Sequence, residues 1–195
     1  MIMKKFDTCH SENCQEYALY SQKTCALHCS NFHQYTISIR KMLEELREID
    51  SINLSGLTLD GIDMSQYQIT GCRLSNIKLL NANLDGAKFS HTFLDFTTIA
   101  NCSFQGIESL HSIFSGSKIT NTNFQESDII NNNMIGIICS KTTFKSSNLS
   151  LSQISNSILT SVNFEDCNLF HTNFVHSNLK NVGFDLSNVE EAIFS

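Results

Sequence analysis

The sequence predicts an all-β solenoid that follows a small Cys/His-rich module and one α-helix. Three observations predict the solenoid: an apolar residue at every fifth position from Leu54 to Phe194, a mostly small side chain two positions before each, and no insertion that breaks the count. Of these 29 positions 28 are apolar, and Ser109 is the exception. A period of five fits neither a helix nor an ordinary strand, so the repeat specifies the whole architecture.

Each five-residue unit is interpreted as one side and one corner of a polygonal coil. The large residue and the small one before it point inward, which gives the alternation of sizes that a tight interior needs. The other three positions face water and carry mostly Ser, Thr, Asn, Gly, Asp, Gln and Lys. We expect backbone pairing between successive coils, about 4.8 Å apart, to satisfy the many turns.

Several units resemble the A(D/N)LXX unit of the pentapeptide-repeat family, and the resemblance covers residues 51–195. They are Ala82-Asn83-Leu84-Asp85-Gly86, Thr122-Asn123-Phe124, Val162-Asn163-Phe164-Glu165-Asp166, Thr172-Asn173-Phe174 and Ser177-Asn178-Leu179. The family resemblance implies a right-handed quadrilateral β-helix with four units, or about twenty residues, per coil. This chain would then form about seven coils, a rod of about 35 Å at the spacing of neighbouring strands.

Residues 1–35 form the predicted Cys/His module. Four of the eight cysteines lie in the first thirty residues, with the spacing Cys9-x4-Cys14-x10-Cys25-x2-His28. Thiolates and an imidazole in a closed tetrahedral set are what structural zinc prefers. The pattern also resembles short bacterial zinc knuckles of the form C-x4-C…A…C-x2-H, which makes zinc the expected cofactor. Cys29 is an alternative to His28 as the fourth ligand.

Two other interpretations of this cluster stay open from the sequence. The cysteines could be reduced and unliganded, because short motifs give false positives. One of them could be a nucleophile served by His10 or His28, although no third orienting group is apparent. The remaining cysteines fall on inward positions of the repeat and are interpreted as packing residues: Cys72, Cys102, Cys139 and Cys167.

Residues 36–50 are predicted to form a capping helix between the module and the repeat at 51–195. Ile39, Leu43 and Leu46 belong to an apolar stripe, and charged residues take the opposite face. Thr36 or Ser38 is the expected N-cap. The expected role is to cover the first coil, since a solenoid end exposes both its core and unpaired backbone. A partner-binding helix is the alternative.

No such cap is apparent at the other end of the repeat, where Phe194 is an inward position. An uncovered coil favours pairing with another copy, so we expect a homodimer through the C-terminal coils. The family resemblance also implies such dimers. The residues expected at this contact are Phe184, Val189, Ile193 and Phe194.

One of the four faces of the predicted rod is acidic. Its outward positions hold six of the twelve acids of the repeat, namely Asp63, Asp85, Glu126, Glu165, Asp166 and Asp185. The family includes acidic dimeric rods that resemble duplex DNA and protect type II topoisomerases, such as DNA gyrase, from quinolone inhibitors. A net charge of −6 suits this role. Two observations argue against it. The acidic residues are much farther apart along the rod than the phosphates are along DNA. The unbroken register also leaves no loop projecting from the rod, whereas the protective family members often carry such loops.

These observations favour a non-enzymatic module for protein–protein interaction over the DNA mimic. No phosphate-binding loop, nucleophile elbow or buried carboxylate pair is apparent, so no enzymatic activity is expected. We expect no direct contact with nucleic acid. No apolar run is long enough for a membrane span or a signal peptide, so we expect no membrane association and a cytoplasmic location.

Overall fold

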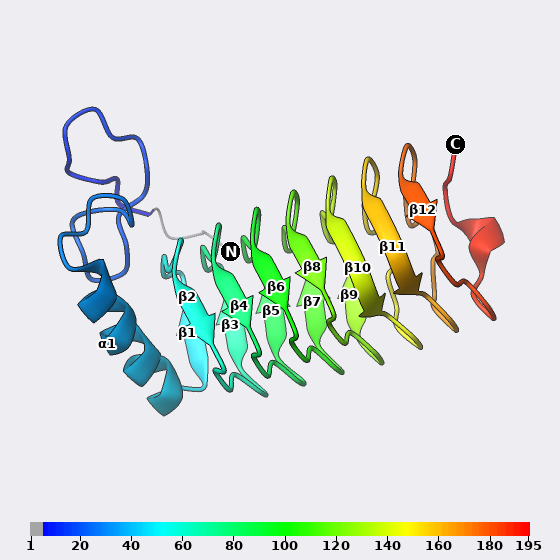
Figure 1. Ribbon diagram of the computed structural model, residues 1–195, viewed down its shortest axis with the longest axis horizontal. Helices are drawn as coiled ribbons and strands as arrows, with labels where there is room; N and C mark the ends of the chain where they lie inside the picture. The colour runs from blue at the N-terminus through cyan, green and yellow to red at the C-terminus, as the bar shows by residue number, and fades with distance from the viewer. Residues whose placement is uncertain (1–5) are drawn as a thin grey trace.

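The computed structural model describes residues 6–195, which form a rod with a small module and one helix at its N-terminal end (Figure 1). A single α-helix, α1 (Phe32–Glu45), precedes the strands, and a 3₁₀-helix, η1 (Val189–Glu191), follows them. The strands are β1 (Glu48–Asp50), β2 (Thr58–Asp60), β3 (Gln68–Thr70), β4 (Lys78–Leu80), β5 (Lys88–Ser90), β6 (Thr98–Ala100), β7 (Glu108–Leu110), β8 (Lys118–Thr120), β9 (Asp128–Ile130), β10 (Ile138–Thr143), β11 (Ile158–Asn163) and β12 (Asn178–Lys180).

Strands of successive coils pair in parallel, always with an offset of twenty residues. Ile49 pairs with Ile69, for example, and Leu59 pairs with Leu79. One face is a five-stranded sheet in the order β1-β3-β5-β7-β9. The opposite face is a seven-stranded sheet in the order β2-β4-β6-β8-β10-β11-β12. Single bridges with the same offset join the coils along the other two sides. This register confirms the four-unit coil and the solenoid of about seven turns.

Each corner of the rod is made by one residue in the left-handed region of backbone conformation. Positive φ angles recur at every fifth residue from Ser51 to Leu186, at 28 consecutive corners. Gly and Asn, which tolerate this region best, occupy half of these corners. A bulkier residue such as Phe96, with φ 55°, adopts it because coil-to-coil pairing on both sides fixes the backbone.

The interior of the rod is filled by the predicted large inward residues. On one side they form a stack of phenylalanine rings, with centroids 4.8 Å apart for Phe104 and Phe124 and 4.9 Å apart for Phe124 and Phe144. The stack continues through Phe164 to Phe184. These rings are almost entirely buried along most of the stack. Contacts between stacked rings add to the free energy gained by burying them.

The small inward residues also make hydrogen bonds between coils. The Ser147 hydroxyl donates to the Phe124 carbonyl at 2.7 Å and accepts from the Ser127 N–H at 3.0 Å. The Cys167 thiol likewise donates to the Phe144 carbonyl at 2.9 Å. Small polar side chains therefore satisfy backbone groups that the ladders leave over, and within residues 6–195 no buried side-chain nitrogen or oxygen lacks a partner.

Ser109, the exception in the apolar column, is paired with an unusually large residue at a small position. The Ser109 hydroxyl donates to Asn132 Oδ1 at 3.1 Å, and Asn132 Nδ2 donates to the Ser109 carbonyl at 2.8 Å. Both side chains are buried. The small residue therefore makes room for the larger one, and the two polar groups satisfy each other.

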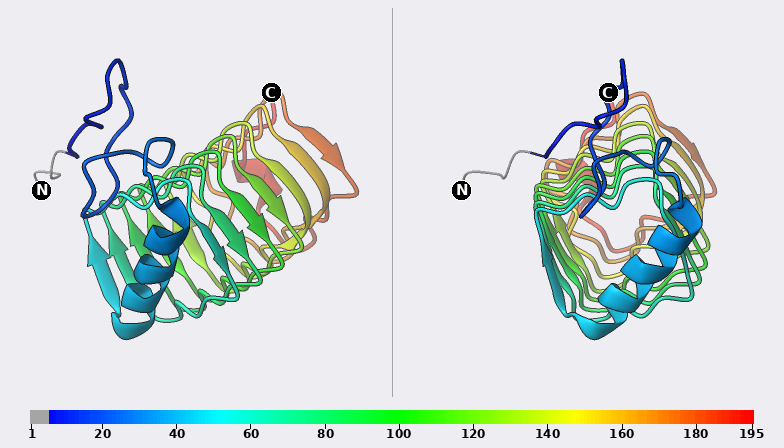
Figure 2. Two further views of the ribbon diagram at one scale, coloured as in Figure 1. Left: turned by 60° about the vertical axis from the view of Figure 1, so that its left-hand side comes forward. Right: turned by 90° about the vertical axis from the view of Figure 1, so that its left-hand side faces the viewer.

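The helix differs in its bounds from the expected residues 36–50. It begins at Phe32 because Asn31, rather than Thr36 or Ser38, is the N-cap, with Asn31 Oδ1 accepting from the Gln34 N–H at 3.3 Å. It ends at Glu45 because Ile49 already belongs to the five-residue column and pairs in β1. The buried helix residues are Tyr35, Ile39 and Leu43, and Figure 2 shows α1 lying across the first coil.

Candidate metal centre

Two tight turns in the N-terminal module bring its ligands together. The first turn places Cys9 and Cys14 side by side, with the Cys9 N–H bonded to the Glu16 carbonyl at 2.8 Å and the Cys14 N–H to the Ser11 carbonyl at 3.2 Å. The second turn is closed by the His28 N–H, which donates to the Cys25 carbonyl at 3.1 Å. Each half of the Cys-x4-Cys…Cys-x2-His pattern thus forms one arm of the site.

The structure brings Cys9, Cys14, Cys25 and His28 into one group, whose ligand atoms all lie within 4.8 Å of one another. Cys14 Sγ is 3.8 Å from Cys25 Sγ, while His28 Nδ1 is 3.6 Å from Cys9 Sγ and 3.4 Å from Cys25 Sγ. Tetrahedral zinc, with bonds of about 2.3 Å to sulfur and about 2.0 Å to nitrogen, requires separations of roughly 3.8 Å and 3.5 Å. The donor set therefore fits a closed four-ligand metal site.

The surroundings of the cluster shift the pKa values of two of its thiols in opposite directions. Burial alone would raise the pKa of Cys9, but hydrogen bonds from backbone N–H groups of Ser11 and Cys25 lower it to about 5. At Cys14 a backbone hydrogen bond from Glu16 favours the thiolate, yet burial and the nearby sulfurs raise its pKa. A neighbouring cation would relieve that repulsion, since metal ligands must be deprotonated.

The two spare residues of the sequence pattern lie outside this group. Cys29 is half-buried and packs against the core that the helix and first coil share. His33 lies in α1 and is exposed. The geometry thus favours His28 over Cys29 as the fourth ligand. None of the eight cysteines, all of which lie in residues 6–195, forms a disulfide.

The module is joined to the first coil through Asn53, a buried polar residue that the sequence did not single out. Asn53 Nδ2 donates to the Ala18 carbonyl at 2.8 Å and to the Tyr17 carbonyl at 3.2 Å, while the Asn53 carbonyl accepts from the Tyr20 N–H at 2.8 Å. Leu19 belongs to the same core as the first coil. The module is therefore docked on the rod by buried contacts.

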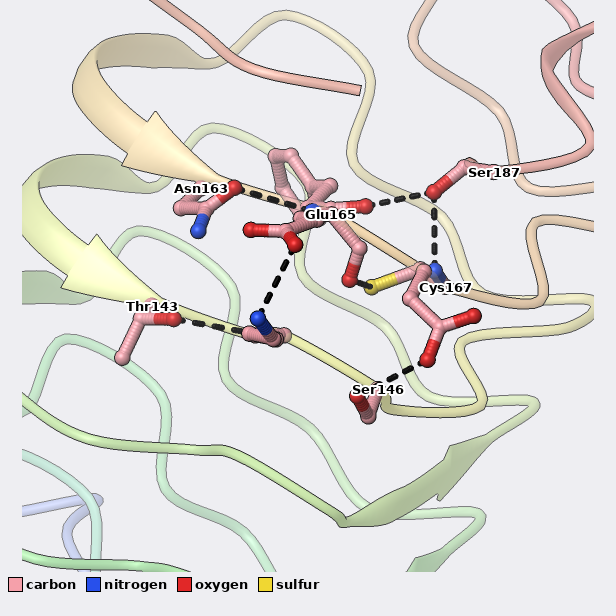
Figure 3. Close-up of polar contacts among 9 residues, drawn as sticks. Thr143, Ser146, Asn163, Glu165, Cys167 and Ser187 are labelled. Carbon is pink, nitrogen blue, oxygen red and sulfur yellow. Dashed lines mark hydrogen bonds and ion pairs between the residues drawn. The ribbon is translucent and has the colours of Figure 1, made fainter. Parts of the chain in front are cut away.

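The acidic face is present as a column, but most of its carboxylates are engaged within the rod. Figure 3 shows the C-terminal part of this column, where Glu165 pairs with the Lys145 ammonium at 2.9 Å and the Ser146 hydroxyl donates to Asp166 at 3.0 Å. Asp85 accepts from the Ser103 hydroxyl at 2.5 Å. The remaining members behave similarly or lie at the surface: Asp63 accepts from the Ser65 N–H, Glu126 from the Gln105 amide, and Asp185 is exposed.

Sequence reasoning missed a ladder of carboxamides along another corner. Asn121 Nδ2 donates to Asn101 Oδ1 at 2.9 Å, Asn101 Nδ2 donates to Asn81 Oδ1 at 3.3 Å, and Asn81 Nδ2 donates to Asp60 at 2.7 Å. Asn at these left-handed corners, twenty residues apart, is the signal that would have revealed it.

At the C-terminal end the last coil leaves apolar side chains partly exposed. Phe194 stacks on Phe174 at 5.2 Å and meets Phe184 edge-on, yet 41% of its surface remains accessible. Val189 and Ile193 are also exposed, at 38% and 37%. The side chains expected at a dimer contact therefore lie together at this end. No helix in residues 6–195 is long and apolar enough to cross a membrane.

Comparisons with known proteins agree with the repeat architecture. The family model for pentapeptide repeats matches residues 68–106 and 147–188, with eight copies of the repeat. No curated protein matches the chain.

Three solved structures illustrate the likeness. The first is HetL, a pentapeptide repeat protein involved in heterocyst differentiation regulation from the cyanobacterium Nostoc (13% identity, 80% of this chain and 95% of HetL covered, TM-score 0.41). The second is QnrB1, a plasmid-mediated fluoroquinolone resistance protein (15% identity, 73% of this chain and 77% of QnrB1 covered, TM-score 0.49). The third is a pentapeptide repeat protein from the Arabidopsis thaliana thylakoid lumen (18% identity, 70% of this chain and 64% of that protein covered, TM-score 0.17). With its matched repeats and its twenty-residue coil register, this chain belongs to the pentapeptide-repeat family.

Proposed function

We propose that the chain is a non-enzymatic protein–protein interaction module, a rigid rod that carries a structural zinc site at one end. The observation that carries this proposal is the four-ligand cluster, whose separations suit tetrahedral zinc and whose turns are docked on the first coil through Asn53. Four protein ligands leave no open position for substrate, which is typical of a structural site. The zinc site would hold the module in one conformation, so that the end of the rod presents a defined surface to a partner.

Metal analysis of the purified protein tests this role. We expect about one zinc ion per chain in the wild type and its loss in Cys14→Ser. Cys102→Ser is the matched control, because Cys102 lies at a small inward position where Ser is common. Wild-type protein without near-stoichiometric metal would contradict the proposal. Crosslinking in the native host, with wild type and Cys14→Ser compared, then shows whether a partner requires the site.

The homodimer belongs to the same proposal. It is supported by the apolar side chains at the last coil, among them Leu186, which is 84% exposed, and Phe194. Covering them with a second copy would remove both apolar surface and open backbone edges from water. Light scattering at micromolar concentration should give about twice the chain mass of 21.9 kDa. A mass of one chain would overturn the dimer.

The acidic column favours one alternative, a DNA mimic that binds a type II topoisomerase and protects it from quinolones. A basic DNA groove attracts an extended anion, although the bonds made by Asp85, Glu165 and Asp166 within the rod weaken this argument. A gyrase supercoiling assay with a quinolone separates the two functions. Protection that is lost on Asp85→Asn and Asp166→Asn, but not on Asp128→Asn from another face, would favour the mimic. No protection would leave the interaction module.

A further inference from the structure

A small pocket lies at the seam between the N-terminal module and the first coils. It has a volume of about 200 Å³ and is lined by both parts of the molecule. Its lining includes Leu19, Ala26 and Leu27 of the module. From the solenoid it includes Gly56, Arg73 and Asn76. Such a space suits a single residue, because sites for drug-sized ligands measure roughly 300 Å³ and more.

Arg73 is the cation of this pocket, and its guanidinium is held between two aromatic rings. Its central carbon lies 4.9 Å from the centroid of the Tyr17 ring, on the module, and 5.5 Å from that of Phe93, on the rod. Both distances are within the range of cation–π attraction, which restrains the guanidinium. Within residues 6–195 no carboxylate forms an ion pair with Arg73.

We propose that this pocket binds the C-terminal residue of a partner protein, with its carboxylate on Arg73 and an apolar last side chain in the pocket. This inference rests on the proposed interaction function and names the chemistry of the partner. A guanidinium fork that is already oriented matches one carboxylate through two parallel hydrogen bonds. Capture of a chain terminus is a recurring mode of peptide recognition.

The surroundings favour a singly charged, partly apolar ligand over a phosphate. Glu16 also lines the pocket, and its charge would repel a dianion more than a monoanion. Leu27 is 83% exposed beside the pocket, so a partner that enters there would also cover an unusually open apolar side chain. A carboxylate joined to an apolar side chain meets both features at once.

The test is a titration of the full-length, zinc-loaded protein, followed by the NMR signals of its backbone amides. The probes are acetyl-Gly-Gly-Leu with a free carboxylate and the same peptide as its C-terminal amide. We expect the free acid to shift the signals of Gly56 and Asn76, and to bind at least ~10-fold more tightly than the amide. Arg73→Gln should abolish the difference, and Arg73→Lys, which loses the fork, should keep only part of it.

Lys118→Gln is the matched control, since it removes one positive charge from an exposed position of β8 outside the pocket. The proposal fails if acid and amide bind equally, if neither shifts the pocket signals, or if inorganic phosphate at equal concentration displaces the peptide. The unchanged rod signals of Arg73→Gln show that the variant is folded. Zinc measured on the same sample separates the two proposals: a zinc-loaded protein that ignores the acid refutes the pocket alone, whereas binding by a zinc-free protein refutes the zinc site alone.

Discussion

The rod and the N-terminal module of this protein are held together in different ways. In the rod each coil repeats the contacts of its neighbours, with the same backbone ladder, the same inward side chains and the same corners. Residues 6–31 contain one antiparallel bridge, between Thr8 and Tyr17, and a cluster of three thiols and one imidazole. A repeated structure distributes its stability over many equal interfaces, whereas a small module concentrates it at one site.

Removing the proposed zinc ion should produce the largest difference between the two regions. In Cys14→Ser, or after chelation, we expect amide exchange in residues 6–31 to reach rates typical of an unfolded chain, because a structural zinc site contributes roughly 10 kcal/mol or more. Exchange in the central coils should not change. Hydrogen exchange with mass spectrometry measures both, and Cys102→Ser provides the control. If the rod unfolds with the module, the two regions are one cooperative unit.

The next largest effect should come from the aromatic stack of the rod. Phe124→Ala removes a ring that is 1% exposed and lies between two others, and should destabilise the rod by about 3–5 kcal/mol. Urea unfolding followed by circular dichroism gives this value. Phe96→Ala, at a ring that is 62% exposed, should change stability by less than about 1 kcal/mol. Equal losses in the two variants would contradict this account of the core.

The joint between the regions should respond less strongly. Asn53→Ala leaves the carbonyls of Tyr17 and Ala18 without their side-chain donor and should weaken docking of the module by about 1–3 kcal/mol. The control is Asn148→Ala, whose side chain makes the same local bond to the N–H two residues on but does not join the regions. Exchange near Asn53 should rise while the zinc content stays constant. Loss of zinc in Asn53→Ala would mean that docking and metal binding are a single event.

Thiol labelling should distinguish the two regions without any substitution in the chain. Burial raises the pKa of Cys72 and Cys167 to about 11 and that of Cys139 to about 12, so these thiols should resist iodoacetamide at pH 8. After chelation Cys9 and the other ligands should be labelled first. In the unfolded chain these thiols would be exposed and would ionise near pH 9. Their burial therefore lowers the free energy of unfolding of the rod only above that pH. Labelling of Cys139 in the native protein at pH 8 would contradict the packing.

The rod could be predicted from the sequence in more detail than the module, for a physical reason. An unbroken period of five, together with the four-unit coil that the family resemblance implies, is enough to place Phe124 and Phe144 in one column, because the chain has no freedom to change register. The pairing of Ser109 with Asn132 could not be predicted, since it depends on which two side chains face each other across a coil. The bounds of α1 were wrong because the cap at Asn31 precedes the apolar stripe.

The ligand spacing of the module predicted which side chains could meet, and the structure brings Cys9, Cys14, Cys25 and His28 together. The docking of the module through Asn53 and the position of Arg73 between two aromatic rings could not be predicted from the sequence. Both depend on how the module is placed on the first coil, and no local pattern encodes that placement. Contacts between different kinds of structure therefore remain the hardest part of such a chain to infer.

The twenty-residue coil also restricts how this protein can change during evolution. Losing or gaining one five-residue unit would turn every later side chain by a quarter of a revolution and move each surface to the neighbouring side. Only a change of four units restores the original orientation, and it shifts everything beyond it by one step along the axis. Lineages would therefore lengthen or shorten such a scaffold in discrete steps, with point substitutions as the route by which its surfaces diversify.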